Sequence, residues 1–165
     1  MTAETGSTEH SLRELWNELS GAQMLRAIAD GRVPSAPHND HLNLRISEVE
    51  PGNVTMTWEP TAAVANPAGV VHGGYVAMTL DDAVCLAGAS FGERFYPMLT
   101  LNLNIDYLRA VLPGATYTVT SELVHPGNRR MVSNARVLDA EGAVAAQATG
   151  SITPNRAYVE KAQQG

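Results

Sequence analysis

The chain has 165 residues, close to the length of one domain, and 44% of them are hydrophobic, which is enough for a full core. Its 17 acidic and 11 basic side chains give a formal net charge of −6 without a long basic run, which argues against a nucleic acid or an anionic membrane as partner. A single cysteine excludes an intramolecular disulfide, and no apolar run is long enough to span a bilayer, so we expect a soluble, cytoplasmic protein.

The N-terminal segment predicts a helix after a short polar tail. Ser11 and Glu14 have the spacing of a capping box, and apolar residues recur at helical spacing over 12–19. We expect this helix to continue through Ile28 and to end at Gly31.

The rest of the chain predicts strands on both sides of one long helix. Residues 41–49 and 53–60 alternate apolar with polar side chains across a Pro-Gly turn, which indicates an antiparallel hairpin. Residues 73–91 are rich in Ala, Leu and Met and are apolar on most sides, as in a helix buried on several faces. Four further strands are expected at 98–109, 115–125, 130–138 and 143–153.

This order of elements predicts an α+β fold, in which an antiparallel six-stranded sheet wraps around the long central helix. We divide the chain into a tail with a helical extension (1–37), the main domain (38–156) and a polar C-terminal tail (157–165).

The residues best suited to chemistry lie where the central helix begins. Residues 66–74 (NPAGVVHGG) lead into the helix, and Asp81 follows His72 by nine positions. Glycines at a helix start let a ligand approach free backbone N–H groups, where the helix dipole favours a developing negative charge. Asp81 shares a helical stripe with Ala77, Val84 and Gly88, so a carboxylate interrupts an apolar face.

This pattern, N-x-x-G-x-x-H-G-G with an acid nine positions after the His, resembles the hotdog-fold acyl-CoA thioesterases of the 4-hydroxybenzoyl-CoA and phenylacetate-pathway type. Residues 41–153 follow the element order of that family, and residues 106–109 (DYLR) and 127–130 (GNRR) resemble its strand ends.

The resemblance implies hydrolysis of an acyl-CoA thioester to a carboxylic acid and CoA, with no cofactor besides the CoA of the substrate. It implies Asp81 as the catalytic carboxylate, the Gly73 N–H as the group that polarises the thioester carbonyl, and Asn66 as a positioning residue. Whether Asp81 attacks as a nucleophile or activates water as a general base stays open. Some members carry Ser or Thr where this chain has Cys85.

The helix geometry predicts that two chains share each site. At about 1.5 Å rise per residue, Gly73 and Asp81 lie roughly 12 Å apart, too far to meet one carbonyl carbon. Two antiparallel copies of the helix across a two-fold axis would join Gly73 of one chain to Asp81 of the other. We therefore expect a homodimer, and the family implies a dimer or a tetramer built from dimers.

Several of these residues have alternative interpretations. Asp82 is the rival acid, and the spacing of the family motif selects Asp81. His72 could be a general base, although directly before a helix it more readily holds the turn by hydrogen bonding. Cys85 is better explained as a small core residue than as a nucleophile, because no His lies at a helical neighbour position.

The remaining substrate contacts follow from the chemistry of CoA, whose phosphates require local positive charge in an acidic protein. We expect Arg109, Arg129 and Arg130 to hold them, with Gly74 and Cys85 completing the substrate-binding set. His38 and His41 lack further ligands to complete a zinc site, so no metal is expected.

Two other functions remain open at this point. One is a hotdog enoyl-CoA hydratase or dehydratase with His72 and Asp81 as an acid–base pair, and the other is a non-catalytic module that binds or senses acyl-CoA. The acyl group is not specified, because its candidate channel residues could equally be core. These residues are Trp58, Tyr75, Met78 and Leu80.

Overall fold

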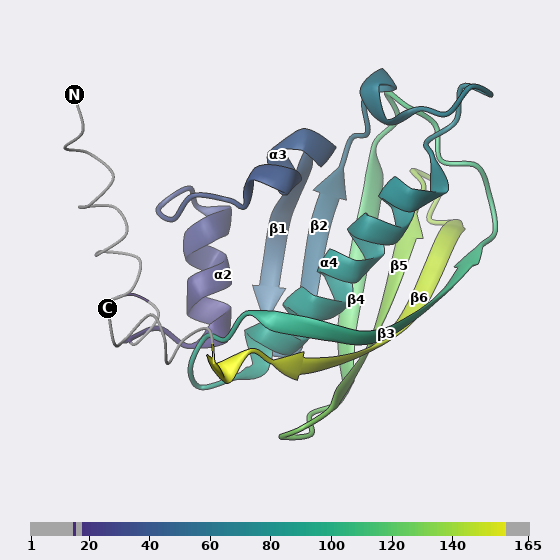
Figure 1. Ribbon diagram of the computed structural model, residues 1–165. Helices are drawn as coiled ribbons and strands as arrows, with labels where there is room; N and C mark the ends of the chain where they lie inside the picture. The colour runs from purple at the N-terminus through teal and green to yellow at the C-terminus, as the bar shows by residue number, and fades with distance from the viewer. Residues whose placement is uncertain (1–14, 16–17, 158–165) are drawn as a thin grey trace.

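The computed structural model describes residue 15 and residues 18–157, and these form one antiparallel sheet that curves around a long helix (Figure 1). The strands are β1 (Leu44–Glu50), β2 (Asn53–Trp58), β3 (Met98–Tyr107), β4 (Tyr117–His125), β5 (Met131–Leu138) and β6 (Val144–Pro154). They lie side by side in the order β1-β2-β4-β5-β6-β3. The predicted α+β class, with six strands around a central helix, is confirmed.

The central helix α4 (Gly73–Phe91) has the bounds expected from the sequence. Its buried face packs on the sheet with small side chains, and Gly88 lies so close to Ile152 that a side chain there would clash. Val84 and Gly88 point into this core, whereas Asp81 is half-buried. The predicted helical stripe of Ala77, Asp81, Val84 and Gly88 is thus half-buried at Ala77 and Asp81 and buried at Val84 and Gly88.

The N-terminal extension differs from the single helix expected from Ser11 onward. Helix α2 (Gly21–Ala29) begins anew, because Ser20 and Gln23 form a capping box of their own. Gly21 lies against the backbone carbonyl of Ala89, so only glycine fits there. The expected capping box at 11–14 falls outside the described residues.

A short helix, α3 (Pro37–Leu42), occupies a segment that was expected to be irregular up to residue 40 and a strand from 41. Pro37 stands in its first turn, where a missing N–H costs nothing, and Asn43 ends it in the left-handed conformation with φ 54°. Strand β1 therefore starts later than predicted, and side chains of α3 contact α4 instead.

The two edges of the sheet differ. Helix α2 packs on β1, and the Arg26 side chain donates to the carbonyl of Val49 at 3.0 and 2.7 Å. Strand β3 has no strand beside it on its outer side among the described residues, and Leu99 and Leu101 there are 48% and 57% exposed. In the described part of the chain, no helix is both long and apolar enough to cross a bilayer.

Candidate active site

The start of α4 presents one backbone N–H without a partner. His72 is the N-cap of the helix, and its Nδ1 accepts a hydrogen bond from the Gly74 N–H at 2.9 Å. The Gly74 N–H is thus already used, whereas the Gly73 N–H bonds to no atom of the described residues. The contact of His72 is the turn-holding one considered from the sequence, and it requires an unprotonated Nδ1.

A cleft of about 310 Å³ opens beside this N–H. It lies between the start of α4 and the segment that follows β3, and it brings Gly73 and Arg109 to one cavity wall. Its lining residues are Val71, Gly73, Val76, Tyr107, Leu108, Arg109, Ala110 and Val111.

Asn66 stabilises the loop that leads into the helix. The short helix η1 (Ala62–Val64) precedes this loop. The Asn66 Oδ1 accepts hydrogen bonds from the backbone N–H groups of Ala68 and Val70 at 2.9 and 3.4 Å. Only its Nδ2 is left to contact a substrate, so the predicted positioning role would have to use this donor.

Asp81 is oriented by a residue that the sequence analysis did not select. The Thr100 hydroxyl on β3 donates to the Asp81 Oδ1 at 2.7 Å and lies 3.3 Å from the Cys85 sulfur. A threonine within the alternating run LTLNLN of an edge strand has no sequence signal that would pair it with an acid 19 residues earlier.

Cys85 is a neutral thiol at physiological pH. Burial raises its pKa to about 11, although the hydrogen bond with Thr100 opposes the shift. A thiol with so high a pKa is a poor nucleophile, which agrees with its interpretation as a packing residue.

Asp82, the rival acid, is held by another partner. The His38 Nε2 on α3 lies 3.1 and 3.0 Å from the two carboxylate oxygens of Asp82. Burial raises the pKa of Asp82, while His38 opposes that shift. The two adjacent acids therefore differ: Asp82 faces His38 on α3, and Asp81 faces Thr100 on the exposed edge strand β3.

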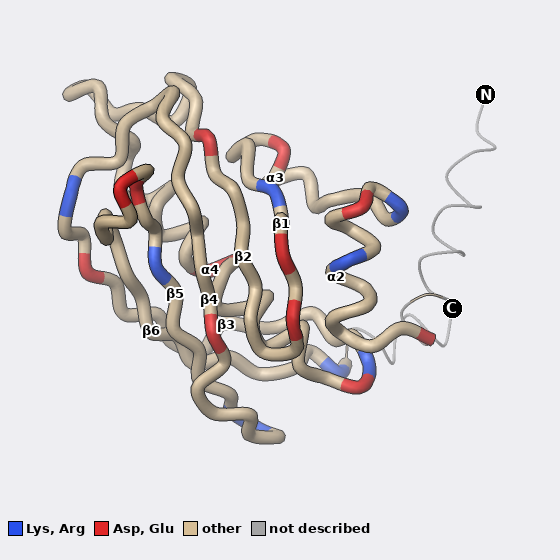
Figure 2. The backbone as a smooth tube through the Cα atoms, turned by 180° about the vertical axis from the view of Figure 1, so that it is seen from behind, with Lys and Arg blue, Asp and Glu red and all other residues tan. Residues whose placement is uncertain are grey.

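The other predicted site residues are scattered. The backbone N–H of Arg109 donates to the carbonyl of Ala145. The side chain of Arg130 instead donates to the Ser151 hydroxyl at 3.1 and 2.7 Å. Residues 145 and 151 are separated by about 20 Å of strand β6, so one chain does not gather the predicted arginines. Figure 2 likewise shows Lys and Arg spread over several elements.

The proposed channel residues divide into two groups. Trp58 and Leu80 are completely buried, so of the two alternatives left open by the sequence, core and channel, they belong to the core. Tyr75 and Met78 remain accessible on α4, where the ring of Tyr75 lies 6.0 Å from that of His41 on α3. The described residues contain no cluster of three or more His, Cys, Asp or Glu that could hold a metal ion.

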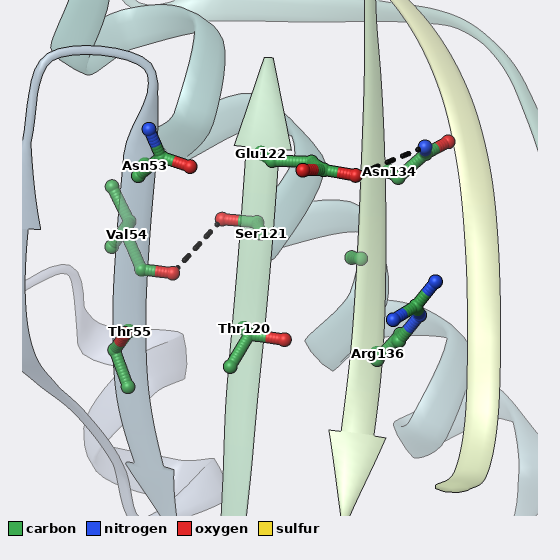
Figure 3. Close-up of a pocket in the computed structure, with 9 residues that line it drawn as sticks. Asn53, Val54, Thr55, Thr120, Ser121, Glu122, Asn134 and Arg136 are labelled. Carbon is green, nitrogen blue, oxygen red and sulfur yellow. Dashed lines mark hydrogen bonds between the residues drawn. The ribbon is translucent and has the colours of Figure 1, made fainter. Parts of the chain in front are cut away.

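A shallow polar hollow of about 200 Å³ lies elsewhere, across β2, β4 and β5 (Figure 3). Asn53, Glu122 and Arg136 are exposed there, on the sheet face opposite α4, because alternate strand residues point to opposite faces. This hollow is separate from Gly73 and Asp81.

Known proteins are similar to the part of the chain that carries Gly73 and Asp81. The family described as the thioesterase superfamily matches residues 68–146, which include Gly73 and Asp81 but not Asn66. The match confirms the resemblance seen in the sequence: the central part of the chain, 79 of its 165 residues, is similar to the thioesterase superfamily.

Individual relatives are distant. The medium/long-chain acyl-CoA thioesterase YigI of Escherichia coli is 27% identical over 148 residues, which cover 81% of this chain and 95% of YigI. The E. coli PaaI protein from the phenylacetic acid degradation operon superimposes with a TM-score of 0.72 at 22% identity, covering 82% of this chain and 96% of PaaI. A hypothetical thioesterase of Streptococcus pneumoniae, solved with coenzyme A, has a TM-score of 0.64 at 27% identity, covering 68% and 89%.

Proposed function

We propose that this protein is an acyl-CoA thioesterase that hydrolyses R–CO–S–CoA to a carboxylic acid and free CoA. The observation that carries the proposal is the pair of groups on α4: a backbone N–H at its start that has no partner among the described residues, and the Asp81 carboxylate, which accepts a hydrogen bond from Thr100. The similarity to YigI, a medium/long-chain acyl-CoA thioesterase, and to the S. pneumoniae protein solved with coenzyme A supports the same substrate class.

In the proposed reaction, the Gly73 N–H donates to the thioester oxygen while negative charge develops on it. The dipole of α4 points its positive end at the same place, which stabilises the tetrahedral oxyanion. Asn66 would orient the carbonyl or the water through its Nδ2.

Asp81 supplies the second half of the reaction in one of two ways. As a general base, it takes a proton from a water molecule that attacks the carbonyl carbon, and the C–S bond breaks to release CoA. As a nucleophile, its carboxylate attacks the carbonyl carbon, and the C–S bond breaks to release CoA as a thiolate. Water then hydrolyses the resulting mixed anhydride, which frees Asp81 and the carboxylic acid and supplies the proton for the thiolate. Both routes leave the acid and the thiol as products.

We further propose that each site needs two chains. The roughly 12 Å between Gly73 and Asp81 along one helix prevents them from acting on the same carbon. The uncovered β3 edge supports self-association, because a long apolar edge strand needs a partner. Thr100 lies on this strand, so pairing there would bring the Asp81 region close to the second chain.

The arginines would serve different parts of CoA. Arg109 borders the cleft at Gly73, near the proposed carbonyl position. Arg129 and Arg130 lie in the exposed turn between β4 and β5, which suits phosphates remote from the reacting carbon.

A thiol-release assay tests the proposal. Purified protein is mixed with short, medium, long, aryl and enoyl acyl-CoAs, free CoA is measured with a thiol reagent, and the absorbance of the enoyl-CoA is followed in parallel. We expect turnover of at least one class, with the medium and long chains tested first because of the likeness to YigI. Loss of enoyl absorbance without thiol release would indicate a hydratase instead, and binding without turnover would indicate a sensing module.

A further inference from the structure

The peptide group between Gly73 and Gly74 is held from both sides. Its carbonyl accepts a hydrogen bond from the Tyr107 hydroxyl at 3.1 Å, and its N–H donates to the His72 Nδ1 at 2.9 Å. Because the peptide group is planar, these two bonds together fix its orientation. Without them, two consecutive glycines would leave the start of α4 unusually free to rotate.

Tyr107 also covers Gly73 by packing. A Cβ built on Gly73 would lie 3.5 Å from the Tyr107 Cε1 and 3.6 Å from its Cζ, so the ring rests against this glycine. Tyr107 ends β3 and lines the cleft with Arg109, although its side chain is 55% exposed and the core does not require it. Its hydroxyl therefore has a defined contact that core packing does not explain.

We propose that Tyr107 is a positioning residue for the Gly73 N–H. An oxyanion donor is effective only when it already points at the place where charge develops. The rotation of the Gly73 N–H depends on the backbone torsions of Gly73, and Tyr107 restrains them from the carbonyl side of that residue. This inference rests on the proposed thioesterase function, in which the Gly73 N–H contacts the substrate.

Strand β3 then positions both halves of the proposed site. Thr100 near its start holds Asp81, and Tyr107 at its end holds Gly73. Strand β3 is also an edge strand, with no strand on its outer side among the described residues. Association with a second chain along this edge would therefore fix the positions of Thr100 and Tyr107.

The variant Tyr107→Phe tests the inference, because it keeps the ring against Gly73 and removes only the hydroxyl. Loss of one hydrogen bond of about 1 kcal/mol predicts a fall in kcat of about fivefold to tenfold. KM for the acyl-CoA and the thermal midpoint should stay close to those of the wild type, because Tyr107 does not stabilise the ground state of the bound thioester. Tyr96→Phe is the matched control, since the Tyr96 hydroxyl bonds to no described residue, and it should leave kcat unchanged.

A double-mutant cycle shows whether the hydroxyl acts through the Gly73 N–H. In a Gly73→Pro background this N–H is absent, so adding Tyr107→Phe should not lower the residual rate further. Equal kcat for Tyr107→Phe and the wild type, or a raised KM with unchanged kcat, would overturn the inference. A wild-type protein that releases no CoA from any substrate would overturn the proposed function instead.

Discussion

The Thr100 hydroxyl donates its single proton to the Asp81 carboxylate at 2.7 Å, and the Cys85 sulfur lies 3.3 Å from the same hydroxyl oxygen of Thr100. Because a carboxylate can only accept, Thr100 has no second proton to give, and Cys85 must be the donor in its contact. A protonated thiol, a hydroxyl and a carboxylate thus form one directed chain, and burial, which raises the pKa of Cys85 to about 11, keeps the thiol protonated.

Replacing Thr100 by valine should impair catalysis while the fold survives, since Thr100 is exposed on an edge strand. A hydrogen bond to a charged group contributes about 1.5–3 kcal/mol, so kcat should fall by about 10- to 100-fold. Thr100→Ser restores the hydroxyl and should recover most of the rate. Turnover of Thr100→Val within about threefold of the wild type would show that Asp81 does not need this contact.

The reactivity of Cys85 should depend on pH in an unusual range. The pKa of its thiol is raised from an ordinary 9.0 to about 11 in the folded protein, so the rate of alkylation by iodoacetamide should keep rising up to that pH. By linkage, a raised folded pKa means that this group's contribution to stability is intact below pH 9.0 and declines as pH rises through about 11.

Mass spectrometry of the modified protein measures this rate, and Cys85→Ser, which leaves no thiol, gives the background. A plateau in the rate at or below pH 9.0, as for an exposed thiol, would contradict the burial of Cys85 beside Thr100.

Arg129 offers the clearer test of phosphate binding, because Arg130 is already engaged with Ser151. Arg129→Ala should raise KM for acyl-CoA with little change in kcat, since contacts remote from the carbonyl bind ground state and transition state equally. The effect should vanish for a pantetheine thioester, which lacks the nucleotide.

Arg130→Ala serves as the comparison and should also lower the thermal midpoint through the lost bonds to Ser151. An equal rise in KM for the truncated substrate in Arg129→Ala would show that Arg129 supports structure rather than phosphate binding.

The sequence predicted the elements of the sheet and α4 well, because their signals are local. Alternation and helical apolar spacing depend only on neighbours in the chain, and the bounds of α4 agree with the prediction. The short helix α3 was missed because its six residues carry little periodicity, although Pro37 in its first turn was a usable signal.

Contacts between segments that are distant in the chain could not be predicted from the sequence. Thr100 meets Asp81 and His38 meets Asp82 only because β3 and α3 both approach α4, and no local pattern encodes that packing. The exposed fractions of the side chains were likewise needed to assign Trp58 and Leu80 to the core, because an apolar residue suits a core and a channel equally well.

Subunit complementation tests the shared site most directly. Gly73→Pro removes the proposed oxyanion donor at the first position of α4, where proline is tolerated, and the extended conformation of His72 (ψ 134°) suits a residue before proline. Asp81→Asn removes the acid. Each variant alone should dimerise and be inactive, with size analysis as the control for folding.

In a mixed dimer, one site carries both lesions and the other carries neither. Co-refolding equal amounts should give about half mixed dimers with one intact site each, which restores about a quarter of wild-type CoA release per chain. If exchange of subunits is verified and no activity returns, Gly73 and Asp81 do not act together from two chains, and the proposed site is contradicted.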